Sequence, residues 1–173
     1  MDSTKWISKK IALLGNHAVG KTSLISRFVE NKFPEGYLTT IGLKVDKKTV
    51  EVDGYKVDLV IWDIAGQENL ANIPHYYLNG CNGFIYVVDL TRLSTYENLQ
   101  SQTLLLKGIL PEAESLLAGN KSDLLEASEL DTVLEDFAIQ PDLLTSAKTG
   151  DKVEELFMLL ARKLIHQHET QGS

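Results

Sequence analysis

Apolar positions along the chain follow two repeating patterns. Short runs, unbroken or alternating, predict strands, and they lie at 10–14, 44–52, 55–62, 84–89, 115–120 and 143–145. Between them, apolar residues recur every three or four positions. This spacing predicts helices with one buried face, at 20–30, 96–109, 129–138 and 153–166. Ser128 precedes the third helix as a candidate N-cap. The last helix is expected to turn inward Val153, Leu156, Phe157, Leu160 and Leu164.

The alternation of strands and helices predicts an α/β fold with a mostly parallel sheet. Such a sheet is covered by helices on both faces. One strand pair departs from the pattern, because Asp53-Gly54 joins two strand runs directly and is a strong signal for an antiparallel hairpin. We expect this hairpin at an edge of the sheet. Ligands of such sheets bind beyond the carboxyl ends of the strands, so the loops there are the candidate sites.

Composition narrows the possible functions. The 173 residues suffice for one domain, which we expect to span 1–173. Lys and Arg number 17 against 24 Asp and Glu, a net charge of −7, which argues against binding of nucleic acid or of an acidic membrane surface. The apolar share of 43% argues against disorder. The single cysteine, Cys81, excludes an internal disulfide and a Cys-rich zinc site.

The ends of the chain carry no targeting signal that the sequence reveals. Residues 1–6 lack the apolar segment of a secretory signal, position 2 is not glycine, and the last residues hold no cysteine for a lipid. The longest apolar runs fall far below the roughly 20 residues of a membrane-spanning helix. We therefore expect a cytoplasmic protein without a membrane anchor. His75 and Cys81 are expected to pack, and His166 and His168 to be ordinary surface residues.

The loop after the first strand carries a phosphate-binding motif. Residues 15–22 match the pattern G-x-x-x-x-G-K-[ST] and lead into a predicted helix. Backbone N–H groups of such a loop surround phosphates, and the helix N-terminus favours an anion. Lys21 would reach the outer phosphates, and Thr22 would ligate Mg²⁺. The alternative is an ordinary glycine-rich turn. The candidate phosphate-binding residues are Gly15, Asn16, His17, Ala18, Val19, Gly20, Lys21, Thr22 and Ser23.

A second candidate constellation, Trp62–Glu68, follows the strand at 55–62. Asp63 at the strand end is placed to hold Mg²⁺, directly or through water. Gly66 offers a backbone N–H where a γ-phosphate would end. Gln67 has an amide that both donates and accepts, so it is able to orient an attacking water. Taken alone, this pattern is equally typical of a strand end and turn, and it gains force only from the phosphate loop upstream.

A third constellation points to the base. Asp123, in Asn120-Lys121-Ser122-Asp123, would accept hydrogen bonds from N1–H and the 2-amino group of guanine. Adenine has neither donor and would leave the carboxylate unpaired, at a cost of several kcal/mol. Asn120 would tie this loop to the phosphate loop, and the stem of Lys121 would lie on the base. The N–H groups of Ser146-Ala147-Lys148 would meet the guanine carbonyl oxygen. Without the phosphate loop, this pattern is most often a polar turn.

Together with Thr40-Ile41-Gly42, these motifs resemble, in order and spacing, the small GTPases of the Ras superfamily. Thr40–Gly42, Trp62–Glu68 and Tyr76-Tyr77 are most similar to the Rab branch. The resemblance covers about 9–166, the expected core. It implies a three-layer P-loop GTPase fold, a G domain with six strands of which one edge strand is antiparallel. It also implies a monomeric signalling switch that binds GTP or GDP with Mg²⁺ and hydrolyses GTP.

The resemblance adds residue roles that the motifs alone do not show. Thr40 matches the threonine that ligates Mg²⁺ and senses the γ-phosphate, which makes Gln67, Lys21 and Thr40 the candidate catalytic residues. Phe33 matches an aromatic packed edge-on against guanine, and Tyr37 one that covers the phosphates; ordinary packing is the alternative for both. By the same likeness, 34–43 and 66–78 are switch regions that contact effectors, exchange factors and activating proteins.

Three departures from the family pattern bear on function. His17 stands where the family often has a small residue, and its imidazole either crowds the γ-phosphate or points to solvent. No arginine stands at an obvious catalytic position, so unassisted hydrolysis is expected at about 10⁻⁴ to 10⁻² s⁻¹. A tail for lipid attachment is missing, which indicates either a trimmed chain or an unlipidated relative.

A nucleotide-bound scaffold without catalysis is the main alternative to a switch that hydrolyses GTP. An adenine-nucleotide kinase is disfavoured by Asp123.

Overall fold

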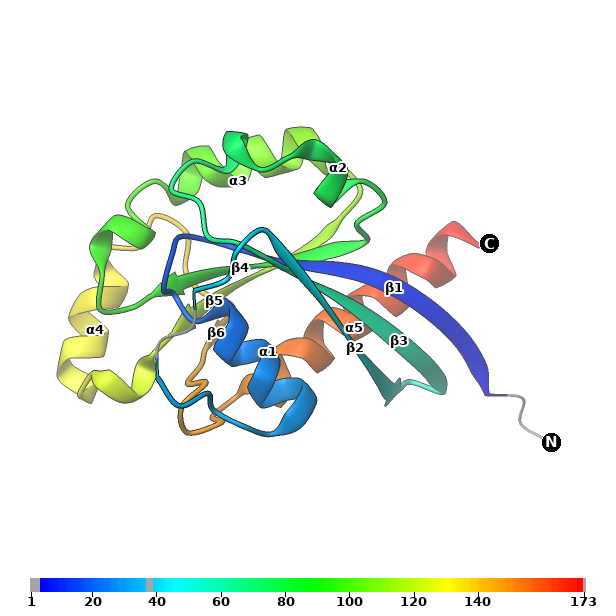
Figure 1. The fold of residues 1–173 in the computed structure, drawn as a ribbon, viewed down its shortest axis with the longest axis horizontal. Helices are drawn as coiled ribbons and strands as arrows, with labels where there is room; N and C mark the ends of the chain where they lie inside the picture. Colours follow the sequence, from blue (N-terminus) through cyan, green and yellow to red (C-terminus); the bar gives the residue numbers. More distant parts are fainter. Residues whose placement is uncertain (1–3, 37–38, 173) are drawn as a thin grey trace.

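A six-stranded sheet forms the centre of the computed structural model, which describes residues 4–36 and 39–172 (Figure 1). The strands are β1 (Lys5–Leu14), β2 (Leu43–Val52), β3 (Tyr55–Ile64), β4 (Gly83–Asp89), β5 (Glu114–Asn120) and β6 (Leu143–Leu144). The helices are α1 (Lys21–Glu30), α2 (His75–Leu78), α3 (Leu99–Ile109), α4 (Ala127–Glu135) and α5 (Val153–Gln171). Three short 3₁₀ turns are η1 (Leu70–Asn72), η2 (Leu93–Thr95) and η3 (Ser122–Leu124).

The strand order is β2-β3-β1-β4-β5-β6. Every neighbouring pair is parallel except β2 with β3. The two residues of the β2–β3 turn, Asp53 and Gly54, both have positive φ, 50° and 80°, as a tight hairpin turn requires. The predicted mostly parallel sheet with one antiparallel edge strand is thereby confirmed.

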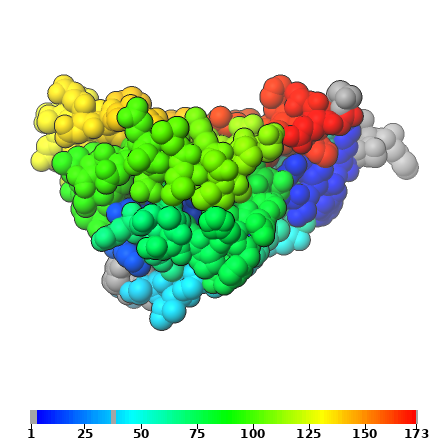
Figure 2. All heavy atoms as spheres, turned by 90° about the horizontal axis from the view of Figure 1, so that it is seen from above, coloured from blue at the N-terminus to red at the C-terminus, as the bar shows by residue number. Residues whose placement is uncertain are grey.

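Helices cover both faces of the sheet, as predicted. Residues of α1 and α5 pack on one face, and those of α2, α3 and α4 pack on the other. Figure 2 looks onto the second face, where the α2–α3 region, in green, occupies the middle of the visible surface. All seven residues of β4 are buried, because this strand lies inside the sheet and is covered from both sides.

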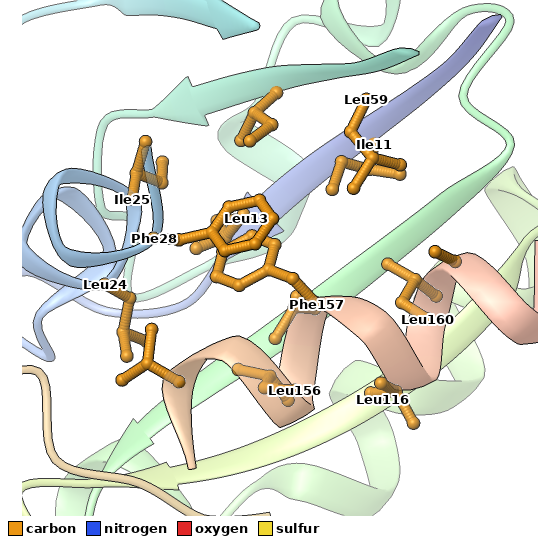
Figure 3. Close-up of a cluster of buried hydrophobic side chains, with 14 of the residues drawn as sticks. Ile11, Leu13, Leu24, Ile25, Phe28, Leu59, Leu116, Leu156, Phe157 and Leu160 are labelled. Atoms are coloured by element: carbon orange, nitrogen blue, oxygen red, sulfur yellow. The ribbon is translucent and has the colours of Figure 1, made fainter. Parts of the chain in front are cut away.

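The first core cluster lies between the sheet, α1 and α5 (Figure 3). The rings of Phe28 and Phe157 stack there at 4.0 Å between centroids and 3° between planes. The residues predicted to face inward from α5 are all buried, so the helical spacing in the sequence identified this face correctly. Within the described part of the chain, no helix combines the length and apolarity needed to cross a membrane.

Several boundaries differ from the sequence prediction. β1 begins at Lys5 rather than at residue 10, because its first half pairs with β3 although its side chains are largely exposed. α3 begins at Leu99, after the 3₁₀ turn η2, and α5 continues to Gln171. Ser128 lies inside α4, so its prediction as N-cap was wrong. The cap is Glu126, whose N–H donates to the Glu129 carboxylate at 2.8 Å.

Candidate functional site

A pocket opens at the carboxyl edge of the sheet, where the loops after β1, β3, β5 and β6 meet the segment that leads into β2. Of the predicted site residues, most line this pocket; Gly15, Asn16, Val19, Asp63, Gln67 and Ser146 do not. Tyr37 lies outside the described residues. The lining residues are His17, Ala18, Gly20, Lys21, Thr22, Ser23, Phe33, Pro34, Gly36, Thr39, Thr40, Gly66, Asn120, Lys121, Asp123, Leu124, Ala147 and Lys148.

The loop between β1 and α1 is shaped by close backbone approaches. Gly15 has a φ of +143°, and a Cβ there would lie 2.3 Å from the carbonyl oxygen of Val87. Gly20 has a φ of +101°, and its Cβ would lie 2.3 Å from Nδ2 of Asn120. Both positions therefore exclude larger residues. This explains in physical terms why both glycine positions of the motif are occupied by glycine.

Lys21, the first residue of α1, folds back over this loop. Its Nζ donates to the carbonyl oxygens of Gly15 at 3.1 Å and Asn16 at 2.8 Å. The side chain is buried, and this desolvation lowers the pKa of Lys21 to about 8, although the Asp63 carboxylate opposes the shift. The positive charge of Arg92 lowers the same pKa further. An anion in the pocket would reverse this shift, since it favours the charged ammonium.

Three side-chain oxygens from separate segments converge beside Lys21. The hydroxyl of Thr22 donates to Oδ2 of Asp63 at 2.7 Å and lies 2.6 Å from the hydroxyl of Thr40. Oδ1 of Asp63 is buried and has no hydrogen-bond partner among the described residues. Burial raises the pKa of Asp63, although the Thr22 hydrogen bond and the Lys21 charge act against it. An unpartnered carboxylate oxygen beside two hydroxyls fits a hard divalent cation such as Mg²⁺.

The loop after β3 lies against the phosphate loop. A Cβ on Gly66 would come within 2.5 Å of the backbone nitrogen of His17. The N–H of Gln67 donates to the carbonyl oxygen of Gly15 at 3.2 Å. Gln67 is half-buried, and its side chain is not part of the pocket lining. His17 is exposed at the rim of the pocket, which it lines.

The opposite end of the pocket is built from the loops after β5 and β6. Asn120 is buried; its Nδ2 donates to the carbonyl oxygen of Val19 at 3.0 Å, and its Oδ1 accepts from the hydroxyl of Thr145 at 3.1 Å. Ser146 donates its hydroxyl to Oδ1 of Asp123 at 2.7 Å. This network fixes the Asp123 carboxylate relative to the phosphate loop, as sequence reasoning anticipated for Asn120.

Three residues that the sequence analysis did not single out also hold the pocket loops. Arg92 Nη2 donates to the carbonyl oxygen of His17 at 2.7 Å, and Arg92 Nε to the carboxylate of Asp89 at 3.0 Å. Arg27 on α1 donates to the carbonyl oxygens of Ala147 and Lys148 at 2.9 and 2.6 Å. Asp89 ends a predicted strand, which was an available signal. The sequence held no such signal for Arg27, because its hydrogen-bond partners lie about 120 positions away along the chain.

Four further candidates, Cys81 and three histidines, lie outside the pocket. Cys81 is buried and donates its thiol to the carbonyl oxygen of Gly83 at 2.9 Å; burial raises the pKa of this thiol to about 11. His166 and His168 are exposed, as predicted. The prediction that His75 packs was wrong, because its side chain is exposed. No cluster of three His, Cys, Asp or Glu side chains suited to a metal occurs in the described residues.

The comparisons with known proteins agree with this geometry. A model of the Ras family matches residues 10–166. Over 163 residues the chain is 40% identical to the Ras-related protein SEC4 of Saccharomyces cerevisiae, and the aligned region covers 91% of this chain and 75% of that protein.

Proposed function

Because the chain belongs to the Ras family, as a Rab-like small GTPase, we propose that the pocket binds GDP and GTP with Mg²⁺ and hydrolyses GTP slowly. A GTP-binding switch protein with GTPase activity is what the family membership establishes. The observation that carries the proposed site is the meeting of three loops at one pocket: the phosphate loop, the Asp63 loop and the loop of Asn120 and Asp123.

The base end of the pocket supports guanine as the ligand. Asp123 lines the pocket with a carboxylate, which pairs with the N1–H and 2-amino donors of guanine and leaves adenine without a match. Ala147 lines the same end; its N–H donates to Oδ1 of Asn120 at 3.3 Å and, in the proposed complex, would also face the guanine carbonyl oxygen. Phe33, 43% exposed, lines the pocket and would gain cover from the purine.

The phosphate end supports a polyphosphate with a divalent cation. Lys21 would exchange its two carbonyl partners for phosphate oxygens and regain full charge. Thr22, Thr40 and Asp63 would hold Mg²⁺, Asp63 directly or through water. Mg²⁺ bound there would neutralise charge on the phosphate oxygens. Gly66 would offer its N–H at the end of the phosphate chain.

Hydrolysis needs an oriented water and stabilised charge. We assign the first task to Gln67, whose amide would position a water in line with the γ-phosphorus. The water oxygen bonds to phosphorus, the bond to the β–γ bridging oxygen breaks, and GDP leaves with that oxygen. The γ-phosphoryl group leaves as inorganic phosphate that carries the water oxygen, and the proton lost by the water passes to the phosphate oxygens. Lys21 stabilises the charge that develops on the bridge. Arg92 does not serve as an arginine finger in this arrangement, because its guanidinium is bonded to Asp89 and His17. Unassisted turnover is therefore slow.

Regulators and effectors are expected at the two switch regions, 34–43 and 66–78. Ile41 is 90% exposed and Tyr76 is 66% exposed. Large apolar side chains with this much solvent exposure are suited to burial in an interface with a partner protein. Binding to these segments would depend on the nucleotide, since Thr40 and Gly66 contact the phosphate end of the pocket.

Identifying the nucleotide that co-purifies with the chain tests the specificity. Chromatography after denaturation should show GDP or GTP, and thermal-shift titration should show stabilisation by GDP and not by ADP. Equal stabilisation by both would contradict the proposal. Counting GDP released per protein, beside a Gln67→Leu variant, tests the activity. A wild-type rate no higher than that of the variant would favour the scaffold alternative, which His17 at the pocket rim keeps open.

A further inference from the structure

We propose that Arg92, acting with Asp89, is a positioning residue that holds the phosphate loop in its binding shape and so sets the lifetime of bound nucleotide. This inference rests on the proposed function, because it concerns the same pocket. Arg92 does not line the pocket. It would act through the backbone of the loop instead.

Asp89, the last residue of β4, is the centre of the arrangement. Its carboxylate is buried and carries four hydrogen bonds. Oδ1 accepts from the N–H of Thr91 at 2.9 Å and from its hydroxyl at 2.6 Å. Oδ2 accepts from Arg92 Nε at 3.0 Å and lies 2.7 Å from Nζ of Lys121. Burial alone would raise the pKa of Asp89, but the hydrogen bonds from Lys121 and Thr91 outweigh it and lower the pKa. The carboxylate is thus charged and fully occupied.

The two cations that pair with Asp89 reach neighbouring carbonyl groups of the phosphate loop. Arg92 Nη2 donates to the carbonyl oxygen of His17, and Lys121 Nζ to that of Ala18, both at 2.7 Å. In a trans peptide the C=O and the following N–H point in opposite directions. Holding these carbonyls toward the cations therefore turns the N–H groups of Ala18 and Val19 to the other side, where a polyphosphate would lie.

Ala18 shows that this loop shape needs support. Its φ is 58°, a left-handed conformation that costs free energy for a residue with a Cβ. The hydrogen bonds to the carbonyl groups on either side of its Cα oppose relaxation to an ordinary conformation. Without Arg92, the His17 carbonyl would be free to turn, and the loop would present fewer N–H groups to phosphate.

The geometry distinguishes an arginine from a simple positive charge. Nε and Nη2 of Arg92 bond two acceptors at once, the Asp89 carboxylate and the His17 carbonyl. The planar guanidinium fixes the angle between these bonds, whereas a lysine ammonium is a single point on a flexible stem. The charge also acts at longer range, since it lowers the pKa of the buried Lys21. If only the positive charge of Arg92 mattered, Arg92→Lys would release GDP at the wild-type rate. If Arg92 positions the loop, Arg92→Lys would release GDP faster.

The experiment measures release of fluorescent GDP from the full chain with Mg²⁺ present, and affinity for GMP. Arg92→Met removes both hydrogen bonds but keeps an apolar stem of similar length. We expect it to release GDP about tenfold faster, the ratio that one charge-assisted hydrogen bond corresponds to. Affinity for GMP, which lacks the β-phosphate, should change less than about twofold. Arg92→Lys should remain several-fold faster than wild type. Arg162→Met, an exposed arginine on α5, is the matched control and should leave GDP release unchanged.

Three results would overturn the inference. Unchanged GDP release in Arg92→Met would show that the loop keeps its shape without Arg92. Equal loss of GDP and GMP affinity would indicate a general structural defect. Wild-type behaviour of Arg92→Lys would show that charge alone matters. If instead the wild-type chain binds GDP no better than ADP, the proposed function fails, which is a separate outcome.

Discussion

Lys21 is the residue whose chemistry depends most on what fills the pocket. In the structure its ammonium group is buried against two carbonyl oxygens, and its pKa is lowered to about 8. A polyphosphate beside it would restore an ordinary, higher pKa. Because the pKa rises on binding, the bound state holds more protons than the free state between about pH 8 and the ordinary lysine value of 10.5.

This difference predicts proton uptake when GDP binds the nucleotide-free chain. At pH 8.5 uptake should reach most of one proton, and near pH 7 the share from Lys21 should shrink to about a tenth of one. GDP affinity should accordingly fall as the pH rises above about 8. Calorimetry in two buffers of different ionisation enthalpy measures the protons directly. Binding at pH 8.5 without uptake would mean that Lys21 is already charged in the empty pocket.

We hypothesise that His17 affects the hydrolysis rate. Its side chain is exposed and lines the pocket, beside the backbone that Gly66 approaches. If the imidazole hinders Gln67 or the attacking water, His17→Gly should raise the single-turnover rate several-fold, about 1 kcal/mol in the barrier. The same substitution in a Gln67→Leu background should have no effect, because the water is then not oriented. An unchanged rate in His17→Gly alone would assign the imidazole to solvent.

At the scale of elements, α1 joins the two ends of the site. It begins with Lys21 at the phosphate loop, and two turns later Arg27 donates to the backbone of the Ala147–Lys148 loop. Arg27 Nη1 also reaches Asn31, the residue that ends the helix, at 3.3 Å. The Arg27 guanidinium thus binds the carbonyl oxygens of the Ala147–Lys148 loop. The N–H groups of this loop are proposed to donate to the guanine carbonyl oxygen.

Replacement of Arg27 should therefore weaken one particular contact to the base. We expect Arg27→Met to lower GDP affinity roughly tenfold, the effect of one charge-assisted hydrogen bond. Affinity for a 2-aminopurine diphosphate, which lacks the 6-oxo group, should fall less. The ratio of GDP to inosine diphosphate reports on Asp123 and should stay constant. Equal losses for all three nucleotides, measured by competition, would show that Arg27 acts on stability rather than on guanine recognition.

The boundaries of helices and strands show which features local sequence patterns are enough to predict. The Asp53-Gly54 turn was predicted correctly because both residues tolerate the positive φ that the hairpin needs. α4 began two residues earlier than predicted, because the Glu129 carboxylate accepts from the N–H of Glu126 at its start. The first half of β1 escaped prediction, since its pairing with β3 is a property of the sheet and leaves no apolar run in the sequence.

At the scale of the whole molecule, α1 and α5 share one core with the sheet (Figure 3). Phe157 is fully buried and stacks on Phe28. Phe157→Ala should lower the free energy of unfolding by about 3–5 kcal/mol, through lost burial and a cavity. Urea unfolding at one fixed GDP and Mg²⁺ concentration measures this, since bound ligand also stabilises the fold. Leu104→Ala, at a site 68% exposed, is the control and should change it by under about 0.5 kcal/mol. A similar loss in both variants would contradict the assignment of the core.

The sequence alone determined the mostly parallel sheet with one antiparallel hairpin at its edge, the inward face of α5 and the three motif loops. These are encoded in local periodicity, in turn residues and in short motifs, which depend on neighbours along the chain. Tertiary structure decided which groups hold those loops in place. Arg92 on the His17 carbonyl, Arg27 on the Ala147 carbonyl and the unpartnered oxygen of Asp63 depend on segments brought together by the sheet. Backbone carbonyls are identical at every position, so no sequence pattern marks the ones that a distant side chain will bind.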